Sequence, residues 1–363
     1  MDTTDDKGFF RDEVATARRT RDALPSGSHV RAALTDAVLN EVTRQIDELS
    51  SEELDFAYTP AAYGLICSLA ADQIVAIDSD IDLVLGQADV PKIPEVTQFL
   101  RTKANQRIGE WYGGLFDLWV KATLIKTGAN VTLDVEMPNG RNHDVGLTIG
   151  TRRFHIESTV LSEPNETREA WDRYTAARLA GTYSGPFVRL GLFCSQTSKV
   201  GMPYSATFRL YLKVFDKIAG DFDPKRSQFA DDEPNILLIS LAGSAMRADY
   251  PGIRWGLDEL FIVQPRTRGI VPEGITDISL ESWVEFEANT RIAAGKITVE
   301  SYCKNRESIL TAPRRLSAIL LFDGCTLAAS RVNYNAKREC RVSHSDMVAL
   351  EGLLTAPARY FDG

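Results

Sequence analysis

The sequence predicts an α/β protein in which helices flank a mixed β-sheet and a helical region precedes it. Three observations lead to this class. Apolar residues recur at helical spacing through most of the first hundred residues, and two later runs alternate apolar and polar residues around Gly150-Thr151, which predicts a β-hairpin. Beyond the hairpin, short apolar runs alternate with amphipathic segments, as expected where helices connect strands of one sheet. We divide the chain into a helical N-terminal region (residues 1–100), a core (101–325) and a C-terminal strand and helix extension (326–363).

Charge and cysteine content restrict the possible functions. The 363 residues carry a net charge of −9 with a pI near 5.2, which argues against a broad nucleic-acid surface because polyanions bind basic faces. Local basic clusters remain candidates, namely Arg18-Arg19-Thr20-Arg21, Arg314-Arg315 and Lys337-Arg338. The five cysteines are odd in number and form no CxxC pair, so we expect reduced thiols in a cytoplasmic protein.

No membrane association is expected. The first residues are acidic and polar, which does not suit a signal peptide. The least polar stretch, residues 61–77, is interrupted by Asp72 and Gln73 and is too short to cross a bilayer. We therefore predict a buried helix there.

Helices account for the N-terminal region. Residues 9–24 and 30–49 have helical spacing, and the Pro-Ser-Gly-Ser break between them offers Ser28 as an N-cap. A third helix is predicted at residues 60–77, followed by an acidic turn at 78–82. This region could pack on the core, bind a partner protein or mediate self-association into a homo-oligomer, and the sequence leaves all three open.

A helix over residues 107–126 and a strand over 130–137 precede the hairpin. One stripe of the helix is apolar, as expected for a helix docked on a sheet: Ile108, Trp111, Leu115, Leu118, Ala122 and Ile125. The neighbouring face carries Glu110, Asp117 and Lys121. Lys121 could supply charge near a metal ion, but we expect it to form an exposed i, i+4 ion pair with Asp117.

The hairpin has arms at residues 142–149 and 152–160. Gly150 can take the positive φ that the first central position of a type II′ turn requires. In that register Asp144 stands directly opposite Glu157, with Cβ atoms roughly 4.5–5.5 Å apart, so both carboxylates could bind one Mg²⁺. A cation would also relieve the repulsion between two close carboxylates. The alternative is a solvated polar face with scattered charges.

The order of these acidic residues resembles a known nuclease family. Glu110 lies on the helix, Asp144 follows the next strand, and Glu157-Ser158-Thr159 ends the hairpin, which is similar to the PD-(D/E)XK nuclease superfamily. The resemblance covers residues 105–160 closely and extends loosely to about 240. It implies a restriction-endonuclease-like fold in which Asp144 and Glu157 bind one or two Mg²⁺ (or Mn²⁺) ions and Glu110 adds a further ligand.

Two departures from the family pattern bear on catalysis. An Asn-His pair stands where a Pro often precedes the Asp, and Thr159 replaces the Lys that activates the attacking water in the family. A threonine hydroxyl can hold a water or a phosphate oxygen but brings no positive charge. Some relatives move the lysine to a neighbouring helix, and the helix predicted over residues 206–219 offers Lys213 and Lys217 on one face.

The remaining elements complete the alternation of helices and strands. Helices are predicted at residues 166–179, 206–219 and 345–354, the last capped by Ser343 or Ser345. Strands are predicted at residues 187–193, 235–241, 257–263, 317–322 and 331–334. Residues 266–304 are expected to be irregular.

Other chemistries lack their motifs. Ser244 follows an apolar run without the second glycine of a nucleophile elbow, the histidines are too scattered for a zinc site, and no glycine-rich phosphate loop opens a helix after a strand. His155 shares the face of Glu157, either as a group that binds water or phosphate or as an ordinary strand histidine.

The function expected from the resemblance is that of a Mg²⁺-dependent nuclease that hydrolyses phosphodiester bonds, with DNA as the favoured nucleic acid and prokaryotic defence as the setting the family suggests. In this scheme Thr159 orients the attacking water. The alternative is a catalytically degenerate nuclease fold that serves as a nucleic-acid- or protein-binding module. The absent motif lysine and the negative net charge would suit that alternative.

Overall fold

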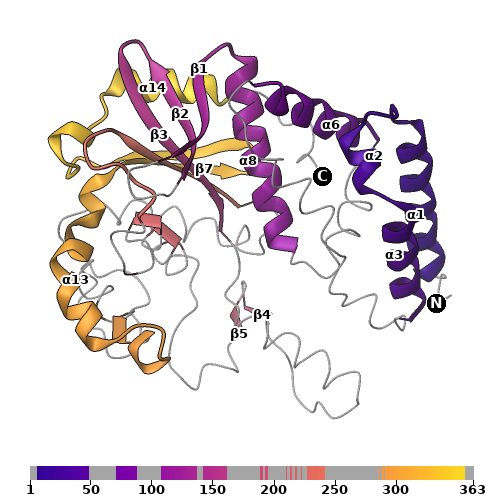
Figure 1. The fold of residues 1–363 in the computed structure, drawn as a ribbon, viewed down its shortest axis with the longest axis horizontal. Helices are drawn as coiled ribbons and strands as arrows, with labels where there is room; N and C mark the ends of the chain where they lie inside the picture. Colours follow the sequence, from indigo (N-terminus) through magenta and orange to yellow (C-terminus); the bar gives the residue numbers. More distant parts are fainter. Residues whose placement is uncertain are drawn as a thin grey trace.

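The computed structural model describes residues 6–48, 71–87, 108–136, 142–161, 189–190, 193–194, 227–241 and 291–355, together with single positions between 210 and 222 and between 285 and 289. These residues build a six-stranded mixed sheet flanked by helices (Figure 1). Across the sheet the strands are β1 (Asn130–Glu136), β2 (Asn142–Ile149), β3 (Arg152–Val160), β6 (Asn235–Ser240), β7 (Leu316–Asp323) and β8 (Thr326–Val332). β1, β2 and β3 pair antiparallel, β3, β6 and β7 run parallel, and β8 returns antiparallel to β7. The predicted α/β class is confirmed.

Helix α8 (Ile108–Lys126) packs on one face of the sheet. Phe116 and Trp119 meet Phe322 of β7, with ring centroids 5.5 Å apart in both pairs. The buried sheet residues in the same hydrophobic cluster include Val145, Leu147, Phe154, Ile156, Leu238 and Leu320. This packing fixes α8 over the strands that carry the predicted acidic pair.

A second hydrophobic cluster covers the other face of the sheet. The described positions between 210 and 218 are helical, as predicted, and they pack with α13 (Val299–Thr311) against β6 and β7. The apolar members include Leu210, Val214, Ile218, Leu237, Ile239, Ile309 and Ile319. Because both faces are covered, β6 is buried along its whole length and reads as a continuous apolar run in the sequence.

The N-terminal helices pack beside α8. They are α1 (Asp6–Ala23), α2 (His29–Ala33), α3 (Asp36–Glu48) and α6 (Ala71–Leu85), and Figure 1 shows them gathered on one side of the molecule. α6 packs against α8, and the buried residues of all four helices belong to the cluster that α8 shares with the sheet. Packing on the core, one of the three roles left open for this region, is confirmed, and binding of a partner protein and self-association stay predictions.

The prediction of a single helix over residues 30–49 was wrong, because the chain forms two helices there, α2 and α3. Thr35 lies at the break, and its hydroxyl accepts a hydrogen bond from the backbone N–H of Val38 (3.3 Å). A threonine in this position caps a new helix. The predicted cap of α2 is confirmed, since the Ser28 hydroxyl accepts from the N–H of Arg31 (3.0 Å).

The acidic turn predicted at residues 78–82 was also wrong, because this stretch is part of α6. Asp78 is buried and accepts a hydrogen bond from the backbone N–H of Val30 (3.0 Å) at the start of α2. The carboxylate thus satisfies a helix N-terminal donor that lacks a partner within its own helix. Asp78, which the sequence suggested lay in a turn, thus links α6 to α2. Residues 60–70, the first part of the helix predicted at 60–77, lie outside the described part of the chain.

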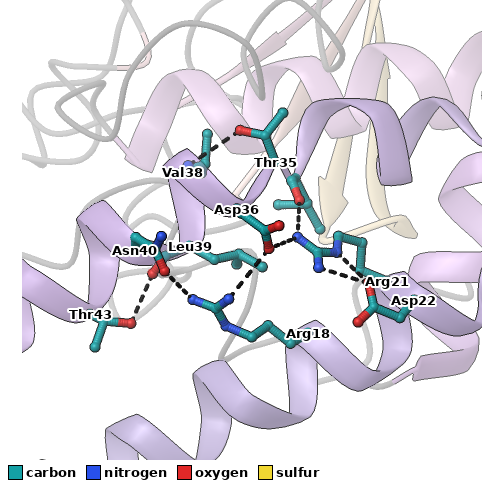
Figure 2. A network of polar contacts seen from close by, with 10 residues as sticks. Arg18, Arg21, Asp22, Thr35, Asp36, Val38, Leu39, Asn40 and Thr43 are labelled. Carbon is teal, nitrogen blue, oxygen red and sulfur yellow. Dashed lines mark hydrogen bonds and ion pairs between the residues drawn. The ribbon is translucent and has the colours of Figure 1, made fainter.

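The first basic cluster ties α1 to α3, as Figure 2 shows. Arg18 donates to Asn40 (2.6 Å) and pairs with Asp36 (3.3 Å), and Arg21 pairs with Asp22 and Asp36 (2.7 Å each). Both guanidinium groups are therefore engaged within the helical region. The other two basic clusters behave similarly.

Those clusters meet at one acidic residue. Arg315 and Lys337 both pair with Asp231, at 2.8 and 3.5 Å. Intramolecular ion pairs thus use residues from all three candidate basic clusters.

Several predictions for the chain after the hairpin need correction. Residues 299–304, expected to be irregular, form the first part of α13, with the Thr298 hydroxyl accepting from the N–H of Ser301. β8 begins at Thr326 instead of 331. The strand predicted at residues 187–193 is replaced by two short strands that pair with each other, β4 (Arg189–Leu190) and β5 (Phe193–Cys194).

The final helix was predicted correctly. α14 (His344–Leu353) begins with Ser343 and Asp346 in a reciprocal capping box. The predicted helix at 166–179 and strand at 257–263 lie outside the described residues. Among the described helices, none has the length and apolar character needed to cross a membrane.

Gly150→Ala should lower the free energy of unfolding by about 1 kcal/mol, because Gly150 has a φ of +62° that an L-residue adopts only with strain. No atom lies within 4 Å of where its Cβ would stand, so the cost would be conformational alone. Thermal unfolding should show a fall of about 1–2 °C in Tm. Gly27→Ala is the matched control, because its Cβ also meets nothing within 4 Å and its φ is not positive. Equal Tm values for the two variants would contradict this account of the turn.

Candidate functional site

The predicted hairpin register is confirmed from Ile149 opposite Arg152 to Val145 opposite Ile156. Asp144 and Glu157 are the next residues along the two strands, where the described ladder between β2 and β3 ends. Beyond the last backbone pair, the Asp144 carboxylate accepts a hydrogen bond from the backbone of β3. Its Oδ2 accepts from the backbone N–H of Ser158 (2.6 Å) and lies 2.8 Å from the Ser158 hydroxyl.

Glu157 is a buried carboxylate, with its side chain 2% exposed. One oxygen, Oε1, accepts a hydrogen bond from the Lys217 ammonium, whereas Oε2 is buried without a hydrogen-bond partner among the described residues. Burial, followed by the negative charge of Asp144, raises the pKa of Glu157 to about 8, although Lys217 acts in the opposite direction. At neutral pH this carboxyl group therefore tends to hold a proton or to require a cation.

Lys217 comes from the helical segment that packs on the face opposite α8. Its ammonium also donates to Gln228 Oε1 (3.3 Å), and the Gln228 amide donates to the carbonyl of Asn142 (3.3 Å). The structure thus places one of the two predicted lysines on Glu157 and holds it there through a loop residue. Lys213, half-buried one turn earlier, is not among the hydrogen-bond partners of Glu157 in the described structure.

A second polar cluster lies between α8, β1 and β3. Lys121 pairs with Asp117 (2.9 Å) and with Asp134 of β1 (3.2 Å), and Asp117 Oδ1 lies 3.0 Å from the Ser158 hydroxyl. The predicted pair of Asp117 and Lys121 forms, but it is buried instead of exposed. Burial alone would lower the pKa of Lys121, but the carboxylates of Asp117, Asp144 and Asp134 outweigh it and raise the pKa above its ordinary value.

The charges of these side chains do not balance. Four carboxylates and two ammonium groups meet here: Asp117, Asp134, Asp144, Glu157, Lys121 and Lys217. Counted over the described residues with every group ionised, these side chains carry two negative charges in excess. Uncompensated charge is costly in a buried environment, so the cluster favours the entry of protons or of one divalent cation.

The oxygen atoms present suit a hard divalent cation. Asp144 uses only Oδ2 to bind Ser158, and Glu157 Oε2 has no partner in the described structure, so each side chain retains one oxygen for a ligand. Among the described residues, no group of three or more His, Cys, Asp or Glu is arranged to hold a metal ion. A cation bound by Asp144 and Glu157 would have two protein ligands, and Mg²⁺ commonly keeps several waters in such sites.

The other two predicted site residues are less defined. Glu110 lies in the first turn of α8, but its side chain falls outside the described atoms. Thr159 is buried in β3 and pairs in register with Ile239 of β6. A role for either in binding metal or orienting water stays a prediction.

Two histidines in ring contact lie beside the acidic pair. The rings of His143 and His155 have centroids 4.2 Å apart, and His155 Nε2 contacts the Glu233 carboxylate. His143 is fully buried, and neither ring nitrogen has a partner among the described residues. Burial first, then the charges of His155 and Arg153, lowers the pKa of His143 to about 3, and burial also lowers the pKa of His155.

His143→Phe should make the protein more resistant to acid. The pKa of His143 is lowered from 6.5 to about 3. Below about pH 6.5 the imidazole is therefore protonated in the unfolded chain but neutral in the folded protein, so the free energy of unfolding falls as the pH falls. At about 1.4 kcal/mol per pKa unit, the loss avoided by the variant should be a few kcal/mol. Urea denaturation near pH 7 and pH 4 measures it. An equal loss of stability in variant and wild type would contradict this role of His143.

The sequence did not single out Asp117, Ser158 or Gln228 as parts of the site. Asp117 lies two turns after Glu110 on the same side of α8, which is a signal that could have identified it. Ser158 and Gln228 carry no such pattern, because their roles depend on contacts between distant segments.

Comparison of the chain with protein-family models, with curated proteins and with solved structures gives no match.

Proposed function

We propose that this protein is a Mg²⁺-dependent nuclease with a restriction-endonuclease-like core and that it hydrolyses phosphodiester bonds in DNA. The observation that carries the proposal is the Lys217 ammonium bound to buried Glu157. It brings, from a separate helix, the positive charge that Thr159 cannot supply at the motif position. The order of elements also agrees with the resemblance, since a helix precedes the three antiparallel strands and a helical segment follows the acidic hairpin.

Each side chain has a distinct task in this proposal. Asp144 and Glu157 would hold the cation, and a bound Mg²⁺ supplies a water of lowered pKa and neutralises charge on the phosphate. The Lys217 ammonium would donate hydrogen bonds to a phosphate oxygen or to the attacking water as that water loses its proton. Gln228 would keep the ammonium in place through its contact with Lys217.

One observation favours a second candidate, a catalytically degenerate binding module. The Lys217 ammonium already occupies one oxygen of Glu157, so part of the buried charge is neutralised within the chain. A module of this kind would fold and bind nucleic acid or protein without a metal ion.

Nuclease assays on supercoiled, linear and single-stranded DNA separate the two candidates. The wild type should cleave with Mg²⁺ or Mn²⁺ and lose activity with EDTA, and Asp144→Ala and Glu157→Ala should each lower the rate by at least about 10³-fold, because the metal contributes several kcal/mol to the transition state. Absence of cleavage by a folded wild type, or equal cleavage by all three proteins, would contradict the nuclease. In the first case, DNA binding without metal would support the module.

A further inference from the structure

Ser158 lies between two carboxylates that belong to different elements. Its hydroxyl oxygen is 2.8 Å from Asp144 Oδ2 and 3.0 Å from Asp117 Oδ1, and its backbone N–H also donates to Asp144. A serine hydroxyl has one hydrogen and can donate it to only one acceptor at a time. Asp117 and Asp144 therefore compete for the same hydrogen.

Asp117 is held in place from its other side. Its Oδ2 pairs with the Lys121 ammonium (2.9 Å), which also reaches Asp134 (3.2 Å). The Asp117 and Lys121 side chains are only 12% and 9% exposed, so their interactions are strong and weakly screened. A continuous polar chain thus runs from β1 through α8 and β3 to Asp144 on β2.

We propose that Ser158 and Asp117 are positioning residues for Asp144: Ser158 holds Asp144 Oδ2, Asp117 accepts the hydroxyl hydrogen when a cation binds, and together they set the affinity of the site for divalent cations. This inference rests on the proposed function. When Ser158 donates to Asp144, it holds Oδ2 against β3 and leaves Oδ1 to the cation. When a cation withdraws charge from Asp144, the hydroxyl hydrogen can turn to Asp117, so that the buried hydroxyl keeps an acceptor in both states.

Calorimetric titration of the full-length protein with MnCl₂ tests this inference. Groups that orient metal ligands typically contribute 10- to 100-fold in affinity, so Ser158→Ala and Asp117→Asn should each weaken Mn²⁺ binding by about tenfold or more. Ser158→Thr retains the hydroxyl and should stay within about threefold of the wild type. Ser317→Ala is the matched control, because it removes a buried β7 hydroxyl that accepts from the N–H of Asn235 (2.8 Å) and leaves Asp144 untouched.

The outcomes separate this inference from the proposed function. If Asp144→Ala abolishes Mn²⁺ binding while Ser158→Ala and Asp117→Asn bind like the wild type, the positioning role is wrong and the metal site stands. If Ser317→Ala weakens binding as much as Ser158→Ala, the effect is a general loss of packing and the positioning role is again wrong. If the folded wild type binds no Mn²⁺, both proposals fail. Should Asp117→Asn not fold because Lys121 loses a partner, Ser158→Ala decides the question.

Discussion

Lys217→Ala is expected to lower the rate of Mg²⁺-dependent DNA cleavage about 10²- to 10⁴-fold while leaving Mg²⁺ affinity equal to that of the wild type or tighter. The rate should fall because the variant loses the ammonium that the described structure places on Glu157. The affinity should not fall, because the ammonium on Glu157 Oε1 repels a cation that binds at Oε2 of the same carboxylate. Steady-state cleavage rates and Mg²⁺ titrations on the same preparations measure the two effects.

Two further variants make this result interpretable. Lys213→Ala removes a lysine one turn earlier in the same helical segment and should keep most of the activity. Lys217→Arg keeps the charge but changes its geometry, so it should recover part of the rate. A loss of cation affinity in Lys217→Ala, or an unchanged cleavage rate, would show that Lys217 serves only to neutralise Glu157.

Mn²⁺ binding should tighten roughly 50-fold between about pH 6 and pH 8 and change little above that range. The reason is the raised pKa of Glu157, about 8, which means that a cation must displace a proton at lower pH. Titration calorimetry in buffers of different ionisation enthalpy should show about one proton released near pH 6.5. A binding constant that does not change with pH would contradict a buried, protonated Glu157.

Glu157→Gln provides the control for this prediction and adds a second readout. In the metal-free wild type, the folded state keeps a proton on Glu157 up to about pH 8, whereas the unfolded chain releases it near 4.5, so stability should fall as the pH rises through this window. Glutamine does not titrate, so the variant should lose this fall in stability as well as metal binding. Urea denaturation at about pH 5 and pH 8 compares the two proteins.

Local patterns predicted the hairpin because it depends on short-range rules. The alternation along β2 and β3 and the turn at Gly150 determine the register, which is confirmed as far as Val145 opposite Ile156, and Asp144 and Glu157 follow where this ladder ends. The same reasoning predicted α8, β6, β7 and α14. Each has a clear apolar period or a capping serine.

The burial of acidic residues and the choice of lysine depend on tertiary contacts, which local sequence patterns do not show. Asp78 and Asp117 looked like exposed acidic residues, but each is buried because another segment supplies a hydrogen-bond donor, the N–H of Val30 in one case and the Ser158 hydroxyl in the other. Helical spacing offered both Lys213 and Lys217, and only the packing of that segment on the sheet selects Lys217 as the partner of Glu157. α13 was missed because its charged composition resembles that of a loop and a Thr298 cap is a weak signal.

The claim that Asp144 and Glu157 form a divalent-cation site is tested most directly by anomalous diffraction from crystals soaked in MnCl₂. We predict one anomalous peak about 2.0–2.3 Å from an oxygen of each carboxylate, and no peak there in Asp144→Ala crystals. A wild-type map without a peak between these two side chains, with Lys217 still bound to Glu157, would contradict the claim.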